Sequence, residues 1–310
     1  MDPLPLDLTR LKTYSLGERK NLVTAAAFAR ALEPSASFAE FFDSLPDILG
    51  AKGLKRLVQA LADAQRDKRV IIWGLGGHVI KVGLGPLIID MMQRGLVSAV
   101  AMNGAAAIHD AEIGLLGATS EDVGEGIKDG SFGMARETAQ WLNGAAREAH
   151  QRGEGFGQSL ARRLVHDGAN RTTSILAASL AHRCPVTVHV AIGQDIVHMH
   201  ASADGAAIGA ATMCDFQRLA GVVAQLDRGV YLNVGSAVAL PEVFLKALAL
   251  ARNLGHQVSG FTTCNIDQLP HYRPRVNVLE RPGGVGLDLR GHHEILVPLI
   301  RMAVLSRMSR

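Results

Sequence analysis

The sequence predicts an α/β protein with a three-layer, Rossmann-like fold, in which helices cover both faces of a parallel sheet. Short apolar runs rich in β-branched residues alternate with longer runs of helical periodicity along most of the 310 residues. Several short runs are apolar throughout, as is typical of strands buried on both faces. Aromatic residues make up only 5% of the chain while glycine is abundant. This composition favours close packing of helices on a sheet over a β-sandwich.

Composition and charge exclude several classes of function. The chain is 48% hydrophobic and 20% charged, with a net charge of +3, and it has no basic run interleaved with aromatics, so it is not expected to bind nucleic acid. The apolar run 295–305 is interrupted by Arg301 and is too short to cross a membrane. Three widely spaced cysteines and a start without signal-peptide features predict reduced thiols in a cytoplasmic protein.

Two regions are predicted. Residues 1–53 mix short helical patterns with four prolines and are expected to form an N-terminal helical arm, packed on the main body or on a neighbouring subunit. Residues 54–310 are expected to form a single α/β domain of the nucleotide-binding type.

The elements of that domain follow in order from the patterns. Strands are predicted at 70–74, 98–102, 185–192, 229–234, 257–262 and 276–279. Helices are predicted at 54–67, 83–94, 132–151, 156–166, 171–181, 205–226, 241–254 and 293–308. Asp204 is an expected N-cap, and Pro241 suits the first turn of its helix. Residues 118–130 are polar and read as a loop.

Glycine or small polar residues follow four of the predicted strands. The four turns are Gly74–Gly77, Asn103–Gly104, Gly193–Asp195 and Asn233–Ser236. Parallel strands end on one edge of a sheet, and glycine lets a backbone approach a phosphate closely, so these turns could hold a dinucleotide. The first turn is not a complete G-x-G-x-x-G, and Asn103 stands where an acid is expected. Tight turns without a ligand are the alternative.

Histidines and acids are frequent near the same edge. In IVHMHASAD, His198 and His200 lie two residues apart and would share one face of an extended segment. With Asp204, Asp110 or Glu112 they could bind a divalent metal, although histidines that only form hydrogen bonds in a polar cleft are the alternative.

Asp195 and Lys81 are two further candidates at this edge. Asp195 follows a strand directly and could bind a cationic substrate or tune a histidine, or serve only as a loop acid. Lys81 follows the first glycine turn and could approach a phosphate or a substrate, or lie on the surface.

Three segments in order resemble the deoxyhypusine synthase family. They are GGHVIKVGLGPLIIDMMQRGLVSAVAMNGAAAIHDAEIGLLGATSEDV at 76–123, CPVTVHVAIGQDIVHMH at 184–200 and VYLNVGSAVALPEVFLKALALARNLGH at 230–256. The resemblance covers roughly residues 54–263 and points to a bacterial branch of the family. It implies a Rossmann-like NAD-binding sheet, a homotetramer with active sites between paired subunits, and transfer of an aminobutyl group from spermidine through a lysine imine.

The resemblance also implies roles for single residues. Those it places beside the cofactor are Gly74, Gly76, Gly77, His78, Gly83, Asn103, Gly104 and Asp110. Asp195 matches an acid that holds the polyamine. The family's imine-forming lysine has no counterpart, because no lysine follows Lys246 and arginine cannot form an imine.

Three hypotheses about function follow. The first is a deoxyhypusine-synthase-like protein that binds NAD(H) and a polyamine or other small amine, with chemistry that differs from lysine-imine transfer. Its candidate catalytic residues are Asp195, His198, His200 and Lys81. The second is a metal-dependent enzyme using His198, His200, His109 and Asp110. The third is a non-catalytic protein that senses a ligand or takes part in assembly.

Overall fold

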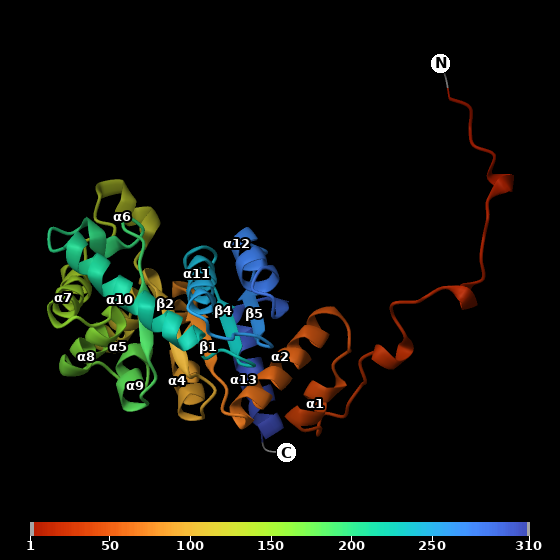
Figure 1. The fold of residues 1–310 in the computed structure, drawn as a ribbon, viewed down its shortest axis with the longest axis horizontal. Coiled ribbons are helices and arrows are strands. Elements are labelled where there is room, and N and C mark those ends of the chain that lie inside the picture. Colours follow the sequence, from red (N-terminus) through yellow and green to blue (C-terminus); the bar gives the residue numbers. More distant parts are fainter. Residues whose placement is uncertain (1–2, 309–310) are drawn as a thin grey trace.

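A computed structural model of the chain describes residues 3–308 and contains one six-stranded sheet (Figure 1). All strands are parallel, in the order β3-β2-β1-β4-β5-β6. The strands are β1 (Ile71–Leu75), β2 (Ala99–Asn103), β3 (Val186–His189), β4 (Val230–Val234), β5 (Thr262–Asp267) and β6 (Val285–Arg290). The predicted three-layer α/β fold is therefore confirmed.

Helices connect the strands and cover both faces of the sheet. The α-helices are α1 (Phe38–Ser44), α2 (Leu49–Arg66), α3 (Gly77–Lys81), α4 (Gly85–Gln93), α5 (Gly104–Leu116), α6 (Val123–Asp129), α7 (Arg136–Arg152), α8 (Phe156–His166), α9 (Ile175–Ala181), α10 (Gly205–Val223), α11 (Ala239–Asn253), α12 (Tyr272–Pro274) and α13 (His293–Met308). Trp73 of β1 packs with residues of α2, α4 and α13 on one face, whereas Tyr231 of β4 packs with α10 and α11 on the other. All residues of β1 and β4 are buried, which explains why their sequences are apolar except for Asn233 and the Tyr231 hydroxyl.

The strand order reverses at β1. The chain moves outward from β1 to β2 and β3, then crosses back to add β4, β5 and β6 on the other side. Ligands of open parallel sheets bind at the carboxyl ends of the strands beside such a switch point. The turns after β1 and β4 flank it here, and they meet closely because residue 76 is glycine: a Cβ at Gly76 would lie 1.9 Å from the carbonyl oxygen of Gly235.

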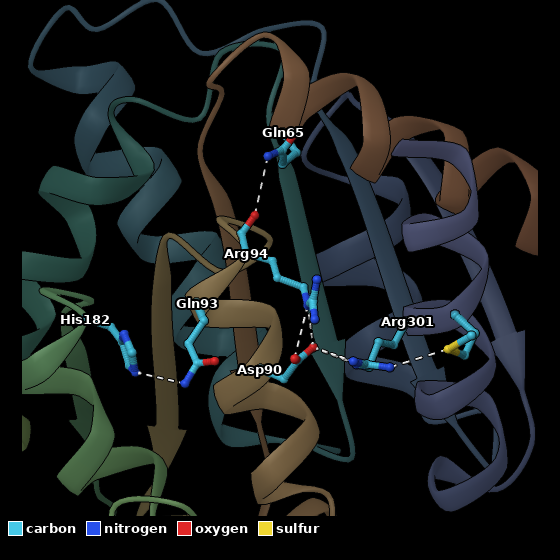
Figure 2. Close-up of polar contacts among 7 residues, drawn as sticks. Gln65, Asp90, Gln93, Arg94, His182 and Arg301 are labelled. Carbon is cyan, nitrogen blue, oxygen red and sulfur yellow. Dashed lines mark hydrogen bonds and ion pairs between the residues drawn. The ribbon is translucent and has the colours of Figure 1, made fainter. Parts of the chain in front are cut away.

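Polar contacts at the carboxyl end of α4 join helices on one face of the sheet (Figure 2). The Asp90 carboxylate accepts hydrogen bonds from Arg94 at 3.0 Å and from Arg301 of α13 at 2.7 Å. Gln65 of α2 donates to the backbone oxygen of Arg94. Because α4 runs away from the carboxyl edge of β1, these contacts stabilise the scaffold and leave the candidate ligand edge free.

Two predicted strands differ from the structure. The strand predicted at 276–279 is wrong: these residues lie in a π-helical turn, η5 (Arg275–Glu280), whose alternating valines are buried. The sixth strand is instead 285–290, an edge strand in which only Leu287 and Leu289 are buried, so its pattern is weak. The strand predicted at 257–262 begins at its last residue and continues to Asp267.

The predicted loop 118–130 contains a helix. α6 begins after Asp122, whose side chain accepts a hydrogen bond from the Glu125 amide at 3.1 Å, and it ends at Gly130 in a left-handed conformation. The polar composition concealed this helix because none of its residues is buried.

The amino-terminal segment departs from the body. Residues 3–36 run outward in an extended path with three short 3₁₀ turns, η1 (Leu8–Arg10), η2 (Leu16–Glu18) and η3 (Ala25–Ala27) (Figure 1). By contrast, α1 and α2 begin within the predicted arm and pack against α13. Within residues 3–308, no helix has the length and apolar character needed to cross a membrane.

Candidate functional site

A cavity of about 630 Å³ opens at the carboxyl edge of the sheet, beside α5. Because α5 starts directly after β2, side chains at helical spacing along one of its faces line the cavity: Ala105, Ile108, His109, Glu112 and Leu116. Segment 118–123, α7 and residues 194–196 form the other walls. We refer to this space as the α5 cavity.

Asp195 is a buried carboxylate at the wall of the α5 cavity. It lies in the loop between β3 and the short 3₁₀ helix η4 (Ile196–Met199), and its residue is only 9% exposed. Its Oδ2 is buried and has no hydrogen-bond partner among the described residues. Glycine at 104 makes room for it, since a Cβ there would lie 2.0 Å from Oδ2. Burial raises the pKa of Asp195 to about 6.

A chain of side-chain hydrogen bonds runs along another wall of the cavity. His109 Nδ1 lies 2.7 Å from the Thr119 hydroxyl oxygen, and that hydroxyl donates to Glu112 Oε2. The other Glu112 oxygen accepts from the Thr138 hydroxyl at 2.7 Å. Burial by itself would raise the pKa of Glu112, but the polar contacts with His109, Thr119 and Thr138 outweigh it and lower the pKa. Glu112 is therefore ionised at neutral pH.

The charges around the cavity are mostly negative. Glu112, Glu121, Glu137 and Asp195 line it, whereas Lys81 is the only lysine or arginine among the lining residues. Trp141 and Phe132 add aromatic surface. Carboxylates combined with aromatic faces suit an organic cation, because both attract positive charge.

The structure separates the residues predicted to catalyse. Asp195 and Lys81 both line the α5 cavity. His198 lies in η4, where its Nδ1 accepts a hydrogen bond from the Gly193 amide at 3.3 Å. His200 Nε2 is 2.8 Å from the backbone oxygen of Gly133. The two histidines therefore do not share one face of an extended segment.

The metal hypothesis does not find support in this arrangement. Among residues 3–308, no three histidine, cysteine, aspartate or glutamate side chains are grouped closely enough to hold a metal ion. The tight turns around His198 and His200 direct their ring nitrogens to backbone groups instead.

Asp110, predicted to contact a cofactor, holds a helix in place. It is fully buried, and its carboxylate accepts hydrogen bonds from the Ser174 hydroxyl at 2.7 Å and from the amides of Ile175 and Leu176 at 2.7 and 3.0 Å. These groups begin α9, so Asp110 stabilises the amino end of that helix. Burial raises its pKa to about 6 in spite of these bonds. We leave Asp110 out of the site.

The predicted cofactor glycines mainly allow close packing between turns and strands. A Cβ at Gly74 would lie 2.8 Å from the Tyr231 hydroxyl, and one at Gly77 would lie 3.1 Å from His109 Cδ2. Gly83 has φ +79°, a conformation that favours glycine. Asn103 caps α5 by accepting a hydrogen bond from the Ala106 amide at 2.9 Å. None of these residues lines the α5 cavity.

His78 is exposed beside the switch point and pairs with His293, a second histidine of the same sheet edge. Its Nδ1 lies 2.9 Å from Nδ1 of His293, the first residue of α13. His293 Nε2 lies 3.0 Å from the Ile266 carbonyl oxygen and therefore carries the hydrogen that is donated there. Burial lowers the pKa of His293, so its Nδ1 accepts from His78 at neutral pH.

The hydrogen-bonded group of side chains in the α5 cavity was not predicted from the sequence. His109 and Glu112 have the i, i+3 spacing that places two side chains on one helix face, and this was the available signal. Thr119 and Thr138 carry no such signal, because their proximity depends on how segment 118–123 and α7 fold back over α5.

Comparisons with known proteins support the fold. No family model matches the sequence, and no curated protein matches it either. Among solved structures, a conserved protein from Methanococcus maripaludis S2 assigned to the LOR/SDH type has 16% identity and a TM-score of 0.54, with 91% of this chain and 75% of that chain covered. A protein from Entamoeba histolytica assigned as a deoxyhypusine synthase has 12% identity and a TM-score of 0.52, with 90% and 96% covered.

A third similar structure contains ligands. AgrE in a ternary complex with ornithine and NAD⁺ has 13% identity and a TM-score of 0.53, with 83% of this chain covered. The chain spans about a third of AgrE, since 33% of that protein is covered. The predicted resemblance to deoxyhypusine synthases is thus confirmed at the level of the fold.

Proposed function

We propose that this protein binds a small organic amine in the α5 cavity and a nicotinamide dinucleotide at the neighbouring switch point, and that it oxidises the amine by hydride transfer. The observation that carries the proposal is Asp195: a buried carboxylate oxygen without a hydrogen-bond donor, at the wall of a cavity large enough for a ligand. A buried unpaired acceptor costs free energy that a bound ammonium group would recover.

The composition of the cavity wall favours an amine over an anion. The three glutamates that accompany Asp195 would repel a carboxylate or phosphate. Trp141 and Phe132 suit the methylene groups and positive charge of an aliphatic amine. The amine is the class of substrate that the resemblance to deoxyhypusine synthases implies, and AgrE, with a similar fold, has been crystallised with ornithine, an amino acid whose side chain ends in an amine.

The proposed dinucleotide site is restricted to the turn after β1. Asp195 lies against Gly104 at the amino end of α5, and its charge disfavours a phosphate there. The residues left to hold a dinucleotide are Gly76, Gly77 and His78, with Gly235 opposite. Gly76 and Gly77 are buried against neighbouring groups, so the exposed His78 is the side chain of this turn that a dinucleotide would reach first. When bound, the cofactor would supply the hydride acceptor.

The wall residues also limit the chemistry. An imine carried on the protein needs a primary amine that can lose its proton, and Lys81 is the only lysine among the residues that line the cavity. We therefore propose hydride transfer without requiring that a lysine carries the product. Aminobutyl transfer through Lys81 would be detected as a covalent adduct after borohydride reduction.

Binding measurements test the proposal directly. Calorimetric titrations with putrescine, spermidine and ornithine, each with and without NAD⁺, should show saturable binding by the wild type. Asp195→Asn should weaken amine binding at least tenfold, because one charge-assisted contact is lost. Asp63→Asn on exposed α2 removes the same charge elsewhere and should leave binding unchanged. Binding of NAD⁺ alone would favour a cofactor protein with a different substrate, and binding of neither would contradict the proposal.

Assembly of several subunits is part of the same proposal. The arm 3–36 exposes apolar side chains such as Leu4, Leu6 and Leu22, which are 88–93% exposed in one chain. Exposed apolar surface of this kind marks interaction sites, and a neighbouring subunit would bury it. Light scattering after gel filtration should give the mass of a homotetramer for residues 1–310 and a smaller species when the arm is removed.

A further inference from the structure

We propose that His109 is the general base of the α5 cavity and removes a proton from the bound ammonium group before hydride transfer. This inference rests on the proposed function and identifies a residue and a step in it. The evidence is the hydrogen-bond chain from Thr138 through Glu112 and Thr119 to His109.

The chain fixes which nitrogen of His109 carries the hydrogen. An ionised Glu112 only accepts, so the single hydroxyl hydrogen of Thr119 is donated to Glu112. The Thr119 oxygen then accepts from His109, and Nδ1 must be the donor over the 2.7 Å contact. In the neutral ring, Nε2 is consequently left with a free lone pair. His109 Nε2 has no hydrogen-bond partner among the residues that the structure describes.

The surroundings hold the ring in this state. Glu112 is fixed by two threonine hydroxyls, one from segment 118–123 and one from α7, so His109 is oriented by three separate parts of the chain. The ionised Glu112 also stabilises the positive charge that forms when Nε2 accepts a proton. The side chains of His109 and Glu112 are only 18% and 15% exposed, which limits screening by water.

The position of Nε2 suits a proton transfer between the two proposed binding sites. Cδ2, the ring carbon bonded to Nε2, faces Gly77: a Cβ there would lie 3.1 Å from it. The basic nitrogen is therefore on the side of the ring nearer to the turn after β1, where we place the dinucleotide. Asp195 and Lys81 line the same cavity.

Amine oxidation requires such a base. An ammonium nitrogen has no lone pair with which to expel a hydride, so one N–H bond must first break, with the proton passing to His109 Nε2 and the electron pair staying on nitrogen. The adjacent C–H bond then breaks, its electron pair leaves with the hydrogen to oxidised nicotinamide, and the nitrogen lone pair forms the C=N bond. The products are an iminium ion, reduced nicotinamide and protonated His109.

Several charged groups line the α5 cavity together with His109. Glu112 lies on its own helix, Lys81 on α3, Glu121 in the segment before α6, Glu137 on α7 and Asp195 before η4. Asp195 is the one among them whose pKa is raised by burial, to about 6. Asp195→Asn enzyme should therefore be profiled in parallel, so that the titration of Asp195 is not mistaken for that of His109.

The test compares His109→Gln with the wild type, using NAD⁺ and putrescine as probes. We expect amine affinity to stay within about threefold and the rate of nicotinamide reduction to fall by about 10²–10⁴, the usual contribution of a general base. The rate of the variant should rise steadily up to pH 9.5, as unprotonated amine becomes available in solution. His166→Gln, an exposed histidine on α8, should match the wild type.

A positioning role for Glu112 gives a second readout. Glu112→Gln should reduce the rate about 10–100-fold and displace the acid limb of the pH profile to lower pH, because the protonated ring loses its counter-charge. Two-bond ¹H–¹⁵N spectra of the wild type should show the Nδ1–H tautomer of His109. An Nε2–H tautomer, or wild-type turnover by His109→Gln, would overturn this inference while leaving amine oxidation intact. A wild type that binds neither putrescine nor NAD⁺ would overturn the proposed function itself.

Discussion

The two halves of the carboxyl edge of the sheet contain similar polar residues and use them differently. Above β4, β5 and β6, several polar side chains pair with one another: Asn233 donates to Asn265 at 2.8 Å, and His78 pairs with His293, although Asn233 Oδ1 has no partner among the described residues. Above β2 and β3, Asp195 has a carboxylate oxygen without a partner and His109 has a ring nitrogen without one among the described residues, and both residues line the α5 cavity. The comparison teaches that an unpaired polar group at the wall of a cavity, rather than an unpaired buried atom alone such as Asn233 Oδ1, marks the candidate site.

The two halves of the edge meet at Gly76, and a substitution of this residue should have the largest effect on the stability of the protein. A methyl group on Gly76 would lie 1.9 Å from a backbone oxygen of the turn after β4, which cannot rotate away. We expect Gly76→Ala to destabilise the protein by about 3 kcal/mol, measured by urea denaturation. Gly209→Ala on exposed α10 has open space around the new methyl and should be neutral or slightly stabilising. Equal stability of both variants would mean that the turns do not touch.

The two buried aspartates beside α5 should respond in opposite ways to the same change. Asp110→Asn removes an acceptor from the hydroxyl and amides that begin α9, and we expect a loss of about 2–3 kcal/mol. Asp195→Asn removes a buried charge that has no partner, so stability should stay the same or rise. Thermal unfolding of both variants at pH 7 measures this difference. A larger loss of stability in Asp195→Asn than in Asp110→Asn would contradict the prediction.

The pH dependence of stability should identify the unpaired carboxylate. The folded-state pKa of Asp195 is raised to about 6, above the usual 3.8, so the folded protein binds this proton more tightly than the unfolded chain does. Wild-type stability is then favoured below pH 4 and declines between pH 4 and 6, by about 1–3 kcal/mol from this group. The free energy of unfolding of Asp195→Asn should fall less between pH 4 and 6, because the variant lacks this titrating group. Burial also raises the pKa values of Asp110 and Asp215, to about 6 and 7, and both groups are present in the wild type and in Asp195→Asn. The difference between the two stability curves therefore isolates the contribution of Asp195.

The smallest effect is expected at the paired histidines. His78 is exposed and donates one hydrogen bond to His293, so His78→Ala should cost about 1 kcal/mol or less. Putrescine binding in the α5 cavity should not change, because His78 does not line it. Calorimetry and thermal unfolding of this single variant would reveal whether the two halves act independently.

Much of the fold could be predicted because its signals are local. The mainly apolar runs at β1, β2 and β4 reflect burial on both faces, and helices 156–166 and 293–308 have the predicted limits. Prediction failed where tertiary contacts decide: η5 has a strand-like alternation but packs as a helical turn, and β6 gains its pairing from β5 alone.

The site was predictable only in part, for a related reason. Position after a strand was enough to select Asp195 and Lys81, which both line the cavity. The same rule selected Asp110, whose partners are 64–66 residues away in the sequence and could not be seen in it. Whether a carboxylate is paired depends on how distant segments fold back, so sequence position could not distinguish Asp110 from Asp195.

The long connection between β2 and β3 has an evolutionary consequence. Helices α5 to α9 lie within this one crossover, and it supplies most of the cavity walls while the turn after β1 remains outside it. Selection could therefore reshape most of the cavity wall by altering a single insertion between adjacent strands, while Asp195 and Lys81 lie outside it. The remainder of the molecule, sheet and switch point included, would be inherited unchanged by descendants with new specificities.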